Sequence, residues 1–271
     1  MSSKREIHLL GDAILDNYSR LTNPAQDLKK ELTDLGFSVN NCAVDDVKVS
    51  DIIHGTVPKE QYTKSRSYPY PIHKDGKMYP LKSVLSAIGV NKSFSPVYSG
   101  VRAPSKHKES TSDNMVVISM GGNDIHSKFA SIFLGAGYFI NSVITPEFTL
   151  NFKKVIETIR SGCDKIVLVS IYLPYLGNGS AYGLYTPLAK PVMDNWNKFI
   201  HGIAKEYNIP VLDLSRTLNI GNRSHYGTDD TRVSNVSSKC IADCLAYIHS
   251  HYNGHHVYFC PDCDSSNIIV E

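Results

Sequence analysis

The chain has 271 residues, of which 42% are hydrophobic and 20% are charged; this composition is typical of globular proteins and excludes disordered or fibrous ones. The net charge is +2, with lysines and arginines scattered rather than gathered into a basic stripe, so we expect no nucleic-acid partner. No apolar run approaches the roughly 18 residues of a membrane-spanning helix, and the run from Ile7 to Leu10 is too short for a signal-peptide core. We therefore expect a soluble, cytoplasmic protein without a secretion signal.

Strands and helices are predicted to alternate along most of the chain. Short apolar runs rich in β-branched residues predict strands at 6–10, 37–44, 115–119, 165–171 and 209–214. Apolar residues at helical spacing predict helices at 24–35, 82–88, 146–160, 187–207 and 234–251. The alternation predicts an α/β fold, with a doubly wound parallel sheet of about five strands and helices on both faces.

We predict a single domain over residues 1–251, followed by a C-terminal tail at 252–271. Within this domain, residues 54–113 are irregular and rich in turn-forming residues, apart from the short helix at 82–88. A segment this long without regular structure is often functional. The sequence leaves two interpretations open, a variable surface insertion and a lid or wall of a substrate pocket.

Three segments lie where a doubly wound sheet binds its ligands, at the carboxyl ends of the strands. Gly11-Asp12-Ala13 ends the first predicted strand, and Gly121-Gly122-Asn123-Asp124 ends the third. Residues 221–234 join the fifth strand to the last helix. As isolated patterns, the first two are also consistent with ordinary turns in which Asp12 and Asn123 serve as caps.

Together, the first two segments resemble the conserved blocks of the SGNH (GDSL-type) hydrolases. The first family block is Gly-Asp-Ser followed by apolar residues and often by Asp-Asn, and the chain has Gly-Asp-Ala-Ile-Leu-Asp-Asn at 11–17. The third block is Gly-Gly-Asn-Asp, which residues 121–124 match in full. The resemblance implies a flavodoxin-like fold and a carboxylic ester hydrolase, an acyl or acetyl esterase or a lipase-like enzyme. It implies a small-molecule ester as substrate and no cofactor.

The resemblance also implies an oxyanion hole. In the family its donors are the asparagine of the third block, here Asn123, and the backbone N–H at the nucleophile position, here residue 13. The glycines before Asn123 permit a tight turn with positive φ. A glycine of a second block is the third donor in the family, but the chain has Ala-Val-Asp-Asp at the matching positions 43–46. Asp46 could offer only its backbone N–H.

Two positions depart from the family pattern in a way that predicts a catalytically inert site. Ala13 stands at the nucleophile position, and a methyl group cannot attack an ester. The last family block is Asp-x-x-His, and the register against the final helix aligns it with Asp229 to Arg232. Arg232 stays protonated and has no acceptor lone pair, so it cannot replace the histidine as general base.

If a form with serine at position 13 is active, its other catalytic groups must come from nearby. Asp229 or Asp230 would orient the base, and His225 and His126 are the candidate bases by their position near the strand ends. Either histidine is also consistent with an ordinary turn or surface residue.

The sequence therefore leaves two main interpretations. Ala13 is either an inactivating replacement of a nucleophilic serine in a hydrolase, or the natural residue of a pseudoenzyme that binds a ligand or a protein partner without turnover. Arg232 favours the second, since a fixed cation could hold an acidic group. A third interpretation, a nucleotide or phosphate binder, is disfavoured because the first turn lacks a glycine-rich phosphate loop.

The C-terminal tail carries His255, His256, Cys260 and Cys263. Imidazole and thiolate groups are the usual zinc ligands, so these four residues form a candidate structural metal site. A redox or surface thiol pair and a plain terminal strand are the alternatives. We expect no metal elsewhere.

Overall fold

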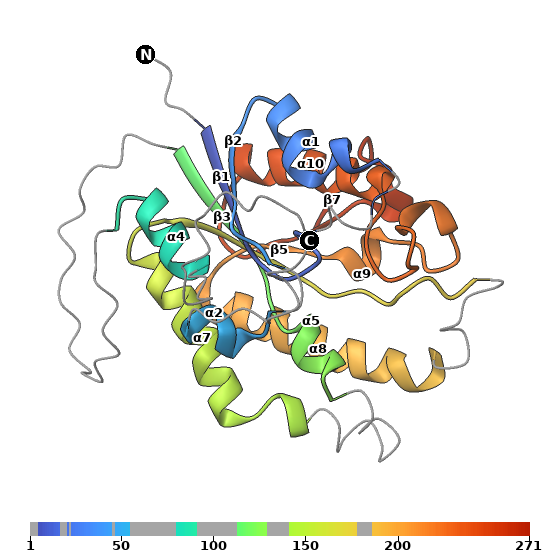
Figure 1. The fold of residues 1–271 in the computed structure, drawn as a ribbon, viewed down its shortest axis with the longest axis horizontal. Coiled ribbons are helices and arrows are strands. Elements are labelled where there is room, and N and C mark those ends of the chain that lie inside the picture. The colour runs from blue at the N-terminus through green and yellow to red at the C-terminus, as the bar shows by residue number, and fades with distance from the viewer. Residues whose placement is uncertain are drawn as a thin grey trace, which may run out of the picture.

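The computed structural model describes residues 5–16, 21, 23–44, 47–54, 80–90, 113–128, 141–177 and 186–271 (Figure 1). Most of the predicted irregular segment at 54–113 lies outside the described residues. Its helix is present as α4 (Pro80–Ala87). The proposed division into a domain and a tail stays a prediction.

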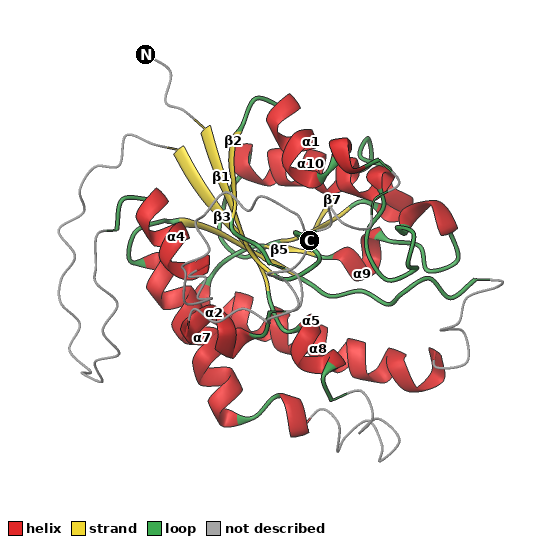
Figure 2. Cartoon of the chain, viewed as in Figure 1, coloured by secondary structure: helices red, strands yellow, loops and turns green. Residues whose placement is uncertain are grey.

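A single seven-stranded sheet forms the centre of the molecule, in the order β2-β1-β3-β4-β5-β6-β7 (Figure 2). The five predicted strands are present as β1 (Arg5–Gly11), β2 (Ser38–Asn41), β3 (Asp113–Ser119), β4 (Lys165–Val169) and β5 (Val211–Leu212). All pair in parallel, as predicted. The prediction of about five strands is too low, because the tail adds β6 (Val257–Phe259), parallel to β5, and β7 (Ile269–Val270), antiparallel to β6.

Helices cover both faces of this sheet, as predicted (Figure 1). On one face α1 (Leu28–Asp34) packs against α10 (Asn235–Ser250). On the other face α7 (Pro146–Arg160) contacts α2 (Val49–His54) and α4, and α8 (Thr186–Tyr207) lies beside it. The remaining short helices are η2 (Pro24–Gln26), α5 (Gly122–His126), α9 (Leu214–Thr217), η5 (Arg223–His225) and η6 (Pro261–Cys263).

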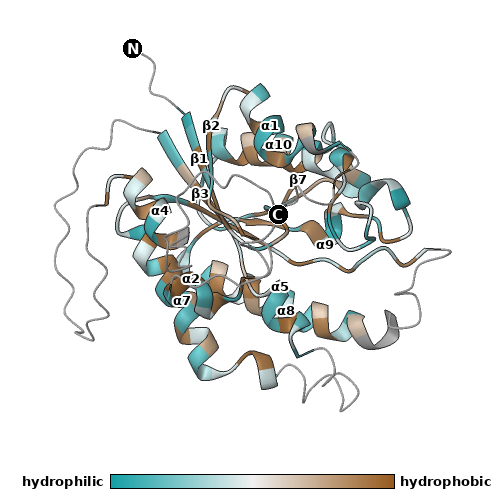
Figure 3. Ribbon diagram, viewed as in Figure 1, coloured by the Kyte–Doolittle hydropathy of each residue, from teal (hydrophilic) through white to brown (hydrophobic). Residues whose placement is uncertain are grey.

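Apolar side chains of the strands and of the inward helix faces form one core (Figure 3). Trp196 of α8 is fully buried, and its ring centroid lies 5.2 Å from that of Phe148 in α7. Side-chain caps fix where the helices begin: Thr145 accepts a hydrogen bond from the backbone N–H of Phe148, at 3.1 Å, and Ser234 caps α10 in the same way. None of the described helices is long and apolar enough to cross a membrane.

The register of β1 and β3 determines where the site lies. These strands pair in parallel with Gly11 opposite Ser119, so they end at the same level. The two family-like segments, each of which follows one of these strands, are therefore brought side by side.

Candidate active site

Gly11 allows the ends of β1 and β3 to approach closely. Its φ is +134°, and a Cβ atom there would lie 1.6 Å from the carbonyl oxygen of Ser119. No other residue type fits this position without moving a strand. The glycine therefore sets the direction in which the chain leaves β1.

Asp12 fixes the turn that follows. It is buried, and its backbone N–H donates to the Ser119 carbonyl at 3.0 Å. Its Oδ1 accepts from the Ser119 hydroxyl at 2.7 Å and from the backbone N–H of Ile14 at 3.2 Å. Asp12 thus ties the β1 turn to β3 and has a supporting role.

Ala13 lies at the outer point of this turn and is half-buried. Its methyl group offers no nucleophile. Among the described residues, none accepts a hydrogen bond from its backbone N–H. That N–H is therefore available to a ligand oxygen, as an oxyanion donor would be.

Gly121 and Gly122 allow the second segment to pack against the first. Gly121 has φ +100° and precedes α5, and a Cβ atom there would lie 1.9 Å from the Trp196 ring. Gly122 is helical, so only one of the two glycines has a positive φ. Gly122 instead allows its backbone to lie close to Asp12, since a Cβ atom on Gly122 would lie 2.9 Å from Oδ2 of Asp12.

Asn123 follows directly in α5 and is half-buried. Its Nδ2 donates to the Val47 carbonyl at 3.0 Å. A side-chain amide has two N–H hydrogens, and no described residue accepts the second one of Asn123. Anchored by Val47, the side chain can offer that hydrogen to a ligand.

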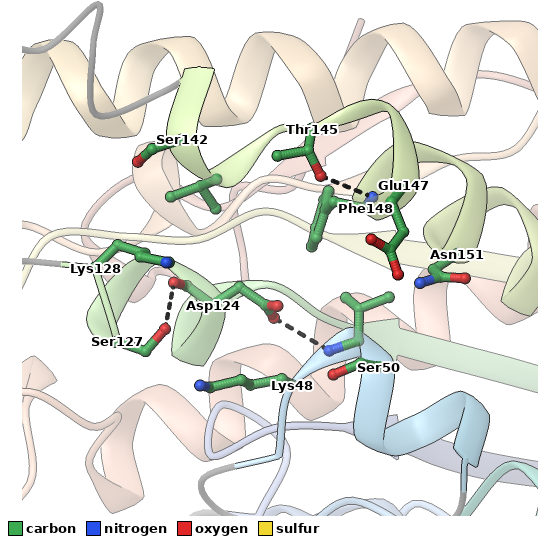
Figure 4. A pocket seen from close by; sticks show the side chains of 12 residues that line it. Lys48, Ser50, Asp124, Ser127, Lys128, Ser142, Thr145, Glu147, Phe148 and Asn151 are labelled. Carbon is green, nitrogen blue, oxygen red and sulfur yellow. Dashed lines mark hydrogen bonds between the residues drawn. The ribbon is translucent and has the colours of Figure 1, made fainter.

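A pocket of about 240 Å³ lies beside the next residue, Asp124 (Figure 4). Oδ2 of Asp124 accepts from the backbone N–H of Val49 at 3.1 Å. Burial raises the pKa of Asp124 to about 6, and this hydrogen bond only partly offsets the effect. Lys48 and Lys128 also line the pocket, so it presents charges of both signs.

Asp229 and Arg232 form a mostly buried ion pair in the loop before α10, their side chains 21% and 16% exposed. Oδ1 of Asp229 accepts from the backbone N–H groups of Thr231 and Arg232, both at 3.1 Å. Its Oδ2 accepts from the guanidinium of Arg232. Burial acts to raise the pKa of Asp229, but these hydrogen bonds and the positive charge outweigh it and hold the pKa below its ordinary value. Two of the predicted site residues, Asp229 and Arg232, are therefore in direct contact.

Asp230 takes no part in this pair. It adopts a left-handed backbone conformation, with φ 61°, and its carboxylate pairs with Arg223 at 2.8 Å. Its carbonyl accepts from the backbone N–H of Tyr175 at 2.8 Å. Of the two predicted orienting acids, only Asp229 lies against position 232.

Tyr172 lies three residues after the end of β4, and its ring centroid lies 6.2 Å from that of Tyr226, in the segment between α9 and α10. Desolvation raises the pKa of its hydroxyl, and the charges of Asp12, Arg232 and Asp229 also act on it. The tyrosine pair thus packs the chain after β4 against the segment that precedes the Asp229–Arg232 loop. Sequence reasoning missed Tyr172, because a single tyrosine after an apolar strand carries no distinguishing pattern.

The structure places the two candidate bases, His225 and His126, in different surroundings. His225 is buried, and its Nδ1 accepts from the backbone N–H of Asn219 at 3.0 Å. Its Nε2 contacts the side-chain amide of Asn222 at 3.1 Å, and burial lowers its pKa. His225 is thus bound within its own turn. His126 is exposed at the end of α5.

The predicted metal ligands are not brought together as a set. His255 and His256 precede β6, whereas Cys260 and Cys263 follow it. The thiols nearest to Cys260 are Cys240 and Cys244 of α10, and Cys244 forms a disulfide with Cys260. The two histidines are therefore the wrong partners for the tail cysteines.

The second oxyanion segment can be followed only in part. Val44 donates its backbone N–H to the Gly11 carbonyl at 2.8 Å, which places this segment beside the β1 turn. Asp45 and Asp46 lie outside the described residues. The contribution of Asp46 stays a prediction.

Comparison with known proteins agrees with this fold. The family model of GDSL-like lipases and acylhydrolases matches residues 7–256. Similar solved structures include the acetyl xylan esterase AlAXEase, at 14% identity, covering 89% of this chain and 98% of that one, with a TM-score of 0.51. The lipase Lip_vut3 from a goat rumen metagenome is 13% identical, with 90% and 97% covered and a TM-score of 0.56. No curated protein matches the sequence. These structural likenesses show a common fold, and the family match shows that the chain belongs to the GDSL-like lipase/acylhydrolase family.

Proposed function

We propose that this site binds a carboxylic ester without hydrolysing it. The observation that carries the proposal is the Asp229–Arg232 ion pair, in which the acid of a hydrolase triad is bound by a cation that cannot accept a proton. Ala13 removes the nucleophile independently. A serine hydrolase that loses its nucleophile or its histidine base alone loses on the order of a millionfold in rate.

The donors that would hold an ester carbonyl are still in place. The backbone N–H of Ala13 and the second side-chain N–H of Asn123 are both available, and each lies in a segment fixed by Asp12 or Val47. Donors held in this way bind an oxygen without reorganising. We expect the carbonyl oxygen of the ester between them.

The ligand that fits best is uncharged. The sequence favoured an acidic ligand on Arg232, but Asp229 already neutralises this guanidinium. An acidic group would have to displace a partner that is held by two backbone N–H groups. We therefore infer a neutral acyl or acetyl ester rather than its acid.

An active hydrolase with serine at position 13 is the second candidate function. One observation favours it: Asp229 is held as an orienting acid must be, by two backbone hydrogen bonds at 3.1 Å. In this alternative Ala13 is an inactivating replacement, and a histidine has to supply the base.

Binding and turnover can be measured on the same protein with p-nitrophenyl acetate and butyrate. We expect saturable heat of binding by calorimetry, with p-nitrophenol released no faster than in buffer. Asn123→Ala should weaken binding about tenfold, as expected for one lost hydrogen bond. The control Asn195→Ala, on the exposed surface of α8, should leave binding unchanged. Release proportional to protein concentration, or no binding at millimolar ester, would refute the proposal.

A further inference from the structure

Cysteines gather at a second place, between α10 and the end of β6. Cys240 and Cys244 are four residues apart in α10, so they lie on the same face of the helix. Cys260 directly follows β6. All three are at most 2% exposed, and their sulfur atoms lie within 4.8 Å of one another.

Cys263 lies beside this group, although its sulfur is not one of the three within 4.8 Å of one another. The backbone N–H of Cys263 donates to the carbonyl of Cys260 at 3.1 Å, which folds the chain back on itself. Left-handed conformations at Asp262 and Cys263, both with φ 55°, produce this turn. The side chain of Cys263 contacts that of Cys240. The Cys263 thiol also lies 3.4 Å from the hydroxyl of Ser237.

The spacing of these residues matches that of structural zinc ligands. One pair is Cys-x₃-Cys on a helix and the other is Cys-x₂-Cys in a tight turn, and structural zinc sites are built from such paired cysteines. Zinc–sulfur bonds of about 2.3 Å in a tetrahedron separate the sulfurs by about 3.8 Å. The sulfurs of Cys240, Cys244 and Cys260 lie within 4.8 Å of one another, which is compatible with that separation.

The backbone of the disulfide-bonded pair also fits a shared ion. The Cα atoms of Cys244 and Cys260 are 7.5 Å apart, whereas disulfides usually join Cα atoms roughly 4.4–6.8 Å apart. Two cysteines that ligate one ion are not limited to that range.

We propose that in the reduced protein Cys240, Cys244, Cys260 and Cys263 bind one zinc ion. Binding replaces the four thiol protons, which pass to solvent, by four zinc–sulfur bonds, and no electron is transferred. Oxidation of Cys244 and Cys260 to the disulfide removes two ligands, so the two states exclude each other. All four positions are filled by protein, which makes the ion structural rather than catalytic.

The ion would fasten the C-terminal strands to the helix that follows the candidate active site. Asp262, within the Cys260–Cys263 turn, accepts from the side chain of Asn219 at 2.7 Å. Asn219 in turn donates its backbone N–H to His225. The zinc would therefore also stabilise the turn that leads into the Asp229–Arg232 loop.

Metal content is the first test. Protein purified with a phosphine reductant should contain about one zinc per chain by elemental mass spectrometry. Cys240→Ser and Cys263→Ser should each lose most of it. The control Cys163→Ser should keep it, because that buried thiol instead donates to backbone carbonyls of Asn114 and Lys165.

Cobalt substitution of the unmutated protein keeps the test valid if a variant fails to fold. Chelation followed by Co²⁺ should give the intense visible bands of tetrahedral cobalt with thiolate charge transfer, and one equivalent of Zn²⁺ should abolish them. Reduced protein without zinc and without these bands would overturn the proposal. So would iron in place of zinc, or full zinc content in both Cys240→Ser and Cys263→Ser.

Discussion

Ala13→Ser combined with Arg232→His should create an esterase, whereas neither change alone should do so. Serine alone would have no base, because Arg232 stays protonated and His225 is bound within its own turn. Histidine alone would have no nucleophile. In the double variant, the carboxylate of Asp229 is already held by two backbone N–H groups and would orient the new imidazole.

The expected magnitude follows from how triad residues act together. Loss of the nucleophile or of the base alone abolishes nearly all of a rate advantage of about a millionfold. Each single variant should therefore remain within about tenfold of the unmutated chain. The double variant should exceed both by at least about a thousandfold, since the backbone N–H of position 13, the Asn123 side chain and the acid are unchanged.

Initial rates of p-nitrophenyl acetate hydrolysis provide the assay. The rate of the double variant should rise with pH through the titration of an imidazole, ordinarily near about 6.5, because only the neutral ring is a base. Ala13→Ser with Arg232→Gln is the matched control without a base, and should stay inactive. Full activity in Ala13→Ser alone would refute the assignment of position 232. An inactive double variant with an unchanged circular dichroism spectrum would do the same.

Three further predictions concern stability. Gly11→Ala should lower the free energy of unfolding by about 3 kcal/mol or more, since its Cβ would lie 1.6 Å from the Ser119 carbonyl oxygen. Urea denaturation measures this change. The control Gly202→Ala, whose Cβ would have nothing within 4 Å, should stabilise its helix by up to about 1 kcal/mol. The pKa of Asp124 is raised from 3.8 to about 6, so the fold loses stability as pH rises across this interval. Asp124→Asn should therefore be more stable than the unmutated chain by up to about 3 kcal/mol at pH 7 and no more stable at pH 4; an equal difference at both values would contradict this. Burial lowers the pKa of His225 from 6.5, so its contribution is complete above that pH and is lost as pH falls. His225→Gln should reduce the difference in unfolding free energy between pH 7.5 and 5.5, and the exposed His251→Gln should not.

The sequence predicts the parallel sheet and the position of the site because both depend on local patterns. Apolar runs followed by Gly11 and Gly121 indicate strands that end in tight turns, and parallel strands place those turns at one edge. The two C-terminal strands have only three and two residues. Such short elements carry too little alternation to be recognised.

Other features depend on contacts between distant segments, which no local pattern encodes. Cys240 belongs to the apolar face of a predicted helix, and only the packing of β6 beside α10 brings Cys260 to it. His225 is a candidate base by position, but the turn from Asn219 binds its ring. The pairing of Arg232 with Asp229 rather than with a ligand also required the structure.

A crystal structure of the protein soaked with p-nitrophenyl butyrate would test the central claim most directly. We expect an intact ester, with its carbonyl oxygen within hydrogen-bond distance of the Ala13 backbone N–H and the Asn123 side-chain amide. Cleaved product in the site, or an ester that contacts neither donor, would contradict that claim.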